Sequence, residues 1–183
     1  MTSSLYLIEH LEPKLWPWCK IEYAQMARDV GIKNLLISNC ASKMRGIKTT
    51  KDSVRAMNFS KPCILDPVAV KMLTPEEARL FETFIFGGIL GDDPPRERTA
   101  IELDIPGERR NLGKLQMSTD TAVRVVWEIA NGKRLKELDF VDGVIIPIQK
   151  GEEILLPYRY LVRNGKPVLA RGLKTFLKKN KGF

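Results

Sequence analysis

The chain has 183 residues, of which 44% are hydrophobic and 28% are charged, values that are ordinary for a soluble globular protein. Its 30 basic side chains outnumber its 22 acidic ones and give a net charge of +8, which favours a polyanionic partner such as RNA or an RNA–protein particle. No apolar run reaches the ~20 residues that a membrane span needs, and no signal peptide is evident, so we expect no membrane insertion. The length predicts a single domain over residues 1–183.

The three cysteines, Cys19, Cys40 and Cys63, are scattered and form no C-x-x-C pair. This pattern is typical of small core residues in a reducing compartment, so we expect a cytoplasmic protein. His10 is the single histidine, which excludes a histidine-rich zinc site, and we predict no bound metal.

Strands and helices are predicted to alternate in the first half of the chain. Buried strands are expected at 4–8, 34–38, 61–65 and 84–86, and an amphipathic helix separates the first two and ends at Gly31. A short helix is expected after Thr50. Thr74 begins another as its N-cap, with Glu77 closing a capping box. The pattern favours an α/β fold with a mainly parallel sheet and helices on both faces.

Polar residues follow two of these strands at their carboxyl ends. Glu9 and His10 come after the first strand, and Asp66 and Pro67 come after the third. Ligands of open α/β sheets bind outside this edge, so these residues are candidates for a site by their position.

The stretch from Phe84 to Thr99 begins as a buried strand and then becomes rich in glycine, proline and charge. Its glycines allow the backbone to approach a ligand closely. Its spacing fits neither a Walker A loop nor the dinucleotide fingerprint. We interpret the stretch as a cofactor or substrate loop of another kind, and a merely structural Gly-Pro loop stays open as the alternative.

The second half of the chain is predicted to begin with a helix after Ser118. Ser118, Thr119 and Asp120 are expected to cap it, and its apolar stripe comprises Ala122, Val125, Val126 and Ile129, before Asn131 and Gly132 close it. The amides of a helix N-terminus also suit a ligand, although capping alone explains the three polar residues.

Residues 138–183 are predicted to form an antiparallel β extension with a basic tail. Asn164 and Gly165 lie between two apolar runs, which is a strong hairpin signal. From Tyr158 to Phe183 there are eight Lys or Arg residues and no acid. Two interpretations stay open for this charge, a solvated and partly frayed tail or a surface that docks on nucleic acid.

Three segments, 65–67, 86–99 and 112–123, together resemble the SPOUT methyltransferase superfamily. More narrowly, they resemble the subfamily first labelled predicted SAM-dependent RNA methyltransferase, whose fungal member is a protein arginine methyltransferase acting on a small-subunit ribosomal protein. Segments 8–10 and 156–160 fit the same subfamily, so the resemblance covers nearly the whole chain.

The resemblance implies a parallel α/β sheet with a deep trefoil knot on its C-terminal side, and S-adenosylmethionine as the cofactor, bent among the knot loops. The cofactor-binding residues that it implies are Leu65, Asp66, Pro67, Gly87, Gly88, Ile89, Gly91, Asp92, Leu112, Gly113, Met117, Ser118, Thr119 and Thr121. It also explains the four glycines of this set as positions where the backbone approaches the cofactor.

Transfer of a methyl group from a sulfonium needs little acid–base chemistry, so positioning of the acceptor supplies most of the rate. If the acceptor is arginine, carboxylates must hold the guanidinium by bidentate bonds. Glu9, Asp92 and Asp93 are the predicted clamp, and Asp92 or Asp93 has the alternative of pairing with a nearby arginine. His10 is predicted to orient the acceptor, with a structural histidine as the alternative.

If the acceptor is RNA, an arginine near the cofactor is expected to dominate, and Arg96 or Arg98 fills that role. A third interpretation is a non-catalytic RNA- or ribosome-binding module. Carboxylates beside the methyl group favour a cationic acceptor, so we predict methylation of an arginine in a small-subunit ribosomal protein, with RNA contacts through the basic C-terminal region. SPOUT enzymes commonly dimerise through the knot region, which the β extension would replace or obstruct, so monomer and homodimer both stay open.

Overall fold

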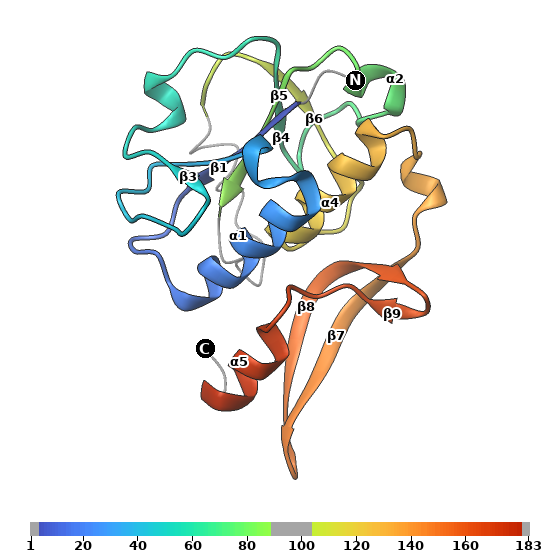
Figure 1. The fold of residues 1–183 in the computed structure, drawn as a ribbon. Coiled ribbons are helices and arrows are strands. Elements are labelled where there is room, and N and C mark those ends of the chain that lie inside the picture. Colours follow the sequence, from blue (N-terminus) through green and yellow to red (C-terminus); the bar gives the residue numbers. More distant parts are fainter. Residues whose placement is uncertain (1–3, 89–103, 181–183) are drawn as a thin grey trace.

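The computed structural model of the chain describes residues 4–88 and 104–180, which form two units (Figure 1). The first unit is a parallel sheet covered by helices, and the second is a long antiparallel hairpin with a short third strand and a helix. The predicted trefoil knot includes the loops 65–67, 87–92 and 112–121, and of these residues 89–92 lie outside the described residues, so the knot stays a prediction.

The sheet of the first unit has the order β3-β2-β1-β5-β4-β6, and every neighbouring pair runs parallel. Its strands are β1 (Leu5–His10), β2 (Leu35–Ser38), β3 (Lys48–Thr49), β4 (Pro62–Leu65), β5 (Thr83–Gly88) and β6 (Glu108–Arg110). The four central strands are almost entirely buried, as expected when both faces of a parallel sheet are covered. The prediction of a mainly parallel sheet is confirmed.

Two strands run further than their apolar residues predicted. Glu9 is paired with Gly87 and His10 with Gly88, so all four residues belong to the ladder between β1 and β5. Strand pairing at this edge of the sheet therefore extends further than expected, as far as His10 and Gly88.

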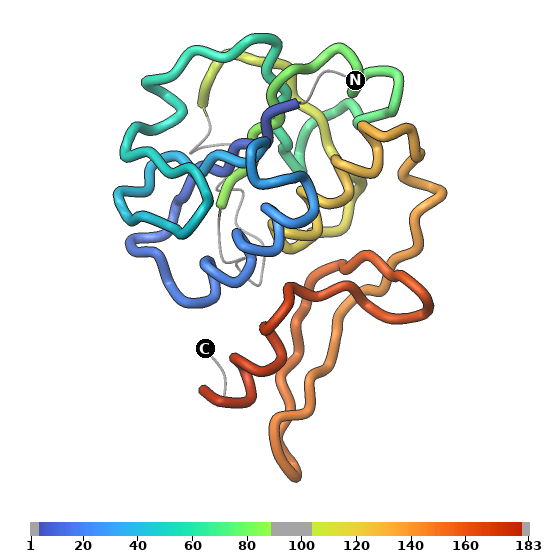
Figure 2. The backbone as a smooth tube through the Cα atoms, viewed as in Figure 1, coloured from blue at the N-terminus to red at the C-terminus, as the bar shows by residue number. Residues whose placement is uncertain are grey.

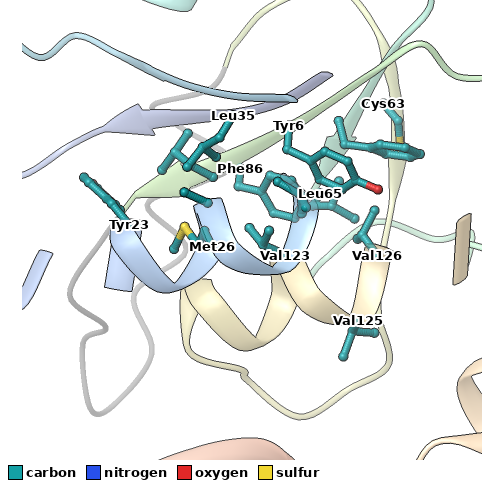
Figure 3. Packing of buried hydrophobic residues seen from close by; sticks show 14 of the residues in the cluster. Tyr6, Tyr23, Met26, Leu35, Cys63, Leu65, Phe86, Val123, Val125 and Val126 are labelled. Carbon is teal, nitrogen blue, oxygen red and sulfur yellow. The ribbon is translucent and has the colours of Figure 1, made fainter. Parts of the chain in front are cut away.

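Two helices pack side by side on one face of the sheet, α1 (Pro17–Val30) and α4 (Thr119–Ala130). Figure 3 shows side chains of both helices meeting aromatic rings from β1 and β5. The buried stripe of α4 comprises Val123, Val125, Val126 and Ile129, whereas Ala122 of the predicted stripe is only partly buried. The longer helix has 14 residues, and none of the described helices is long and apolar enough to span a membrane.

The opposite face of the sheet carries a smaller apolar cluster. Its strand residues are Leu7, Leu36, Ile64 and Ile85. In the described residues these are covered by Val54 and by partly buried side chains around it. Val54 begins η2 (Val54–Ala56), a 3-10 turn that stands where a short helix was predicted.

Three further short elements connect the sheet. They are η1 (Ile32–Asn34), α2 (Pro75–Ala78) and η3 (Leu135–Glu137). Thr74 caps α2 as predicted, because its hydroxyl oxygen accepts a hydrogen bond from the Glu77 amide at 3.3 Å. The Glu77 carboxylate does not close a capping box, and binds Arg110 at 2.9 Å instead.

The second unit consists of β7 (Phe140–Gln149), β8 (Glu152–Arg163), β9 (Lys166–Pro167) and α5 (Leu173–Asn180). The hairpin predicted at Asn164 and Gly165 is confirmed, and both residues have the positive φ that such a turn requires. The basic tail is a helix as far as Asn180, because Leu173 and Leu177 are buried against the hairpin.

The two units share a buried seam. Trp18 of α1 belongs to the apolar cluster of the hairpin, together with Tyr160 of β8 and Leu177 of α5. The Arg159 amide of β8 donates to the Gln116 carbonyl at 2.8 Å, just before α4 begins. The hairpin is therefore fixed to both helices of the first unit, below the carboxyl ends of the strands (Figure 2).

Replacing Leu177 with Ala is expected to loosen α5 from the hairpin, because removal of a fully buried leucine side chain typically costs about 2–5 kcal/mol. Hydrogen exchange of the α5 amides measures the effect and should accelerate, while exchange in β1 and β5 stays unchanged. Lys174→Ala, at an exposed position of the same helix, is the control. Equal exchange in both variants would contradict the packing role of Leu177.

Candidate functional site

The predicted site residues of the described chain gather at the carboxyl edge of the sheet. Glu9 and His10 end β1, Gly87 and Gly88 lie beside them on β5, and the first turn of α4 approaches from below. The Thr119 hydroxyl of α4 donates a hydrogen bond to the Gly87 carbonyl of β5, at 3.4 Å. The structure thus brings together three of the segments that the sequence selected.

Asp66 lies in the next loop of this edge, after β4, and its side chain is 4% exposed. Its carboxylate accepts hydrogen bonds from Arg109 at 2.8 Å and from the Val68 amide at 3.1 Å. Its own amide donates to the Arg110 carbonyl at 2.9 Å. The carboxylate therefore fixes the shape of the loop.

Glu9 is buried, with 3% of its surface exposed, and its carboxylate already holds three donors. The hydroxyl of Ser38 donates at 2.5 Å, the hydroxyl of Ser53 at 2.6 Å and the amide of Val54 at 3.1 Å. A carboxylate so engaged has little acceptor capacity left for bidentate binding of a guanidinium. Its predicted clamp role stays a prediction, and the geometry gives it a structural role as the link between β1, β2 and η2.

His10 is also buried, and its Nδ1 atom lies 2.8 Å from the hydroxyl of Tyr23 on α1. Burial lowers the pKa of the imidazole, against smaller opposite effects of the Lys14 carbonyl and of nearby carboxylates. The ring is therefore neutral at pH 7. Its Nε2 atom is buried and makes no hydrogen bond of ordinary geometry in the described part of the chain, although the Lys14 carbonyl lies near enough to act on the ring.

Gly88 shows that one predicted cofactor glycine is needed by the protein itself. A Cβ at this position would lie 2.7 Å from Ile8, 2.8 Å from the Tyr23 hydroxyl and 2.9 Å from the Glu9 carbonyl. Such distances are shorter than van der Waals contact, so no larger residue fits between β1 and α1 without displacement. The tight packing around the strand explains this glycine without a ligand.

The loop from Leu112 to Thr121 is held on both sides. Asn111 accepts from the Gly113 amide at 2.9 Å and donates to the Ala69 carbonyl at 2.7 Å, which ties the loop to the one after β4. Met117 forms a bridge with Arg159 of β8 on the other side. Gly113 has a φ of +94°, a conformation that favours glycine.

The polar start of α4 differs from its prediction. Ser118 is the N-cap residue, but its side chain makes no capping hydrogen bond. Its hydroxyl instead lies 2.7 Å from Asp120 Oδ1 and 2.9 Å from the Thr121 hydroxyl. The prediction of a side-chain cap by Ser118 was therefore wrong, because the neighbouring side chains compete for the hydroxyl.

The residues at this edge fit an S-adenosyl group. Leu65, Leu112, Met117 and Leu135 belong to one apolar cluster, which suits an adenine ring. The loops around them present main-chain groups, and among the described residues only Leu135 lies within 4 Å of where a Cβ of Gly113 would stand. S-adenosylmethionine supplies an electrophilic methyl group on a sulfonium. Of the predicted residues, Ile89, Gly91, Asp92, Asp93, Arg96 and Arg98 lie outside the described residues.

A second set of buried polar residues was missed by the sequence analysis. Glu22 of α1 and Asp120 of α4 are both buried, and burial followed by the proximity of Asp120 raises the pKa of Glu22. The available signal was the position of Glu22, four residues after Trp18 on the buried face of its helix.

Comparison with solved structures defines the class of fold. Trm10 from Thermococcus kodakaraensis matches with a TM-score of 0.54 at 17% identity, over 73% of this chain and 96% of that one. At this identity the likeness shows the fold alone, and that fold is the SPOUT methyltransferase fold. The fold class implied by the sequence is thereby confirmed.

The family follows from closer relatives. The chain is 33% identical to protein arginine N-methyltransferase SFM1 of Saccharomyces cerevisiae, over 96% of this chain and 94% of the yeast protein. Crystal structures of the yeast enzyme complexed with SAM and with SAH match with TM-scores of 0.89 and 0.86 at 32% identity. They cover 98% and 95% of this chain, and 92% and 94% of the yeast chains. Residues 5–182 also match the family model described as protein arginine N-methyltransferase SFM1-like, so the chain belongs to the SFM1-like family.

Replacing Gly88 with Ala is expected to destabilise the ligand-free protein by about 1–3 kcal/mol, the usual cost of overpacking a core. Denaturant unfolding without cofactor measures this. If Gly88 were needed only so that the backbone can approach a cofactor, the Gly88→Ala variant without ligand would be as stable as the wild type. Only its affinity for the cofactor would then fall.

Replacing Glu9 with Gln is expected to lower stability by about 1–3 kcal/mol, because the amide would place a donor against the donors that the carboxylate now accepts. Thermal unfolding, calorimetric SAM binding and methyl transfer are measured together, with Glu152→Gln at an exposed hairpin position as the control. Loss of transfer at full stability would support the guanidinium clamp instead. Unchanged stability and transfer would contradict both roles.

Proposed function

We propose that this protein transfers the methyl group of S-adenosylmethionine to an arginine of a small-subunit ribosomal protein. The observation that carries the proposal is the likeness to yeast SFM1 along 96% of the chain, including every described segment of the carboxyl edge. The three described segments assigned to the cofactor by sequence meet at that edge and contain the apolar and main-chain groups that the cofactor requires.

The reaction forms a bond between a guanidinium nitrogen and the methyl carbon and breaks the bond from that carbon to sulfur, whose electron pair stays on sulfur. The attacking nitrogen gives up one proton, so a basic group or water must receive it. His10 lies at the carboxyl edge, and burial lowers the pKa of its imidazole, which favours the neutral ring at pH 7. His10 is therefore our candidate for orienting the acceptor or receiving its proton.

An RNA acceptor is the alternative, and the described site gives it less support. The likeness to Trm10 shows the fold alone and carries no substrate. Buried carboxylates lie at the described edge, at Glu9 and Asp66, and although donors of the protein engage both, an anionic edge suits a cation better than a phosphate backbone.

The basic charge of the chain agrees with a reaction that takes place on the ribosome. The chain carries a net charge of +8, and the lysines of α5, Lys174, Lys178 and Lys179, are exposed while its leucines face the hairpin. We place contacts with ribosomal RNA on this face of α5. Cys19, Cys40 and Cys63 are free and buried, which agrees with a reducing compartment and a cytoplasmic location.

Transfer of labelled methyl from S-adenosylmethionine into purified ribosomal subunits tests the acceptor. The expected result is label in one protein of the small subunit, which yields methylarginine on hydrolysis. Label in RNA would overturn the proposed acceptor and direct attention to Arg96 and Arg98. Absence of label despite calorimetric cofactor binding would contradict the ribosomal substrate, and absence of cofactor binding would contradict the activity itself.

A further inference from the structure

Buried ionisable side chains gather at the seam where α1, α4 and β8 meet. They comprise the buried carboxylates Glu22 and Asp120, the partly buried carboxylate Asp29 and one guanidinium, Arg124, which is 1% exposed. Arg124 binds Asp29 at 2.5 Å and is thereby neutralised. No salt bridge within residues 4–88 and 104–180 joins Glu22 or Asp120 to a cation, so negative charge is in excess at this seam.

Asp120 carries an acceptor atom that its surroundings leave unused. Its Oδ1 accepts from the Ser118 hydroxyl at 2.7 Å, whereas its Oδ2 is buried and has no hydrogen-bond partner in the described chain. Buried polar atoms of native proteins are almost always paired, so an unpaired carboxylate oxygen indicates a donor that arrives from outside. Asp120 as a whole is only 2% exposed.

Burial acts on both carboxyl groups, and the charge of Asp120 acts on Glu22. Burial raises the pKa of both, and the proximity of Asp120 raises that of Glu22 further. Arg124 on the same helix, the Ser118 hydroxyl and the Thr121 amide oppose the shift at Asp120, and Asp29 adds to it. Without a ligand, a proton held by the pair compensates the excess charge, and a cation entering the seam would take its place.

The surroundings of the pair suit a guanidinium better than an ammonium. Trp18 donates its Nε1 hydrogen to Glu22 at 2.6 Å, and Tyr160 of β8 lies in the same apolar cluster as Trp18. A guanidinium presents planar donors to two carboxylates and stacks on aromatic faces, whereas an ammonium is more strongly hydrated. Glu22 and Ser118 keep 6% and 8% of their surface exposed, so the group reaches the edge of the seam.

The group also lies next to the segments assigned to the cofactor. Asp120 directly follows Thr119, whose hydroxyl contacts the Gly87 carbonyl at the end of β5. The residue before Ser118, Met117, forms the bridge that joins this loop to β8. A guanidinium held by Asp120 would therefore lie within one helical turn of the carboxyl edge.

We propose that Glu22 and Asp120 form the anionic subsite that receives the guanidinium of the target arginine, an assignment that rests on the proposed function. It differs from the clamp predicted from the sequence, in which Glu9 was a member, because Glu9 is occupied by three donors while Asp120 has a free oxygen. On binding, the guanidinium forms hydrogen bonds with both carboxylates, and the proton that they held leaves to solvent.

Binding of methylguanidinium to the full chain, in the presence of S-adenosylhomocysteine, tests this subsite without methyl transfer. Calorimetry is run on the wild type and on the Glu22→Gln and Asp120→Asn variants. We expect binding to the wild type with proton release, and binding about thirtyfold or more weaker in both variants, the effect of removing one charge from a buried pair. Glu128→Gln is the matched control, since Glu128 is an equally buried carboxylate of α4 that Lys133 and Arg163 already pair.

Equal affinity of the wild type and Asp120→Asn for methylguanidinium, or no binding to the wild type, would overturn the subsite. Methylguanidinium binding through Asp120 in a protein that leaves ribosomal proteins unlabelled would contradict the proposed function and leave the subsite standing. If a ribosomal protein is labelled, and the Glu22→Gln and Asp120→Asn variants label it with unchanged KM and kcat, the proposed function would stand and the subsite would be contradicted.

Stability against pH separates loss of binding from loss of folding. The raised pKa of Glu22 means that the folded state holds its proton more tightly than the unfolded state. The free energy of unfolding of the wild type should therefore fall as pH rises above the ordinary value of 4.5, and this fall should be smaller in Glu22→Gln. An identical pH dependence in the two proteins would contradict the shared proton and with it the subsite.

Discussion

One buried carboxylate holds the carboxyl edge of the sheet together. Glu9 ends the central strand β1 and accepts from Ser38 at the end of β2 and from two donors at the start of η2. Because an ionised carboxylate is an acceptor only, and water is excluded here, each of these donors depends on it. Because β1 is held in place, Gly87 and Gly88, which pair with it on β5, are held in place too. These residues are the part of the candidate site that lies on the sheet.

Periodicity and turn chemistry predicted most of the fold, since the apolar strands and the Asn164–Gly165 turn have strong local signals. The ends of β1 and β5 were missed because Glu9 and Gly87 interrupt the apolar pattern, although strand pairing continues through them. The terminal helix α5 was missed because its two buried leucines stand among lysines, and only the hairpin beneath them makes that spacing a core.

The candidate site was predicted less completely, for a physical reason. Motif resemblance locates loops, and the described loops meet where it placed them. It does not tell whether a given side chain is already occupied, as the carboxylates of Glu9 and Asp66 are. Nor does it pair residues on different helices, so Glu22 was not singled out and Asp120 was predicted only as part of the polar start of its helix. Their interaction exists only because α1 and α4 pack together.

The short outer strands of the sheet have a consequence for recognition. In the described chain, β3 spans two residues and β6 three, and both carry charged side chains, Lys48 on one and Glu108 and Arg109 on the other. Short, charged edge strands offer few free amide and carbonyl groups to an incoming chain and oppose edge-to-edge aggregation. A polypeptide that binds beside the parallel sheet is therefore expected to be recognised by its side chains, since β-augmentation of this sheet finds little backbone to extend.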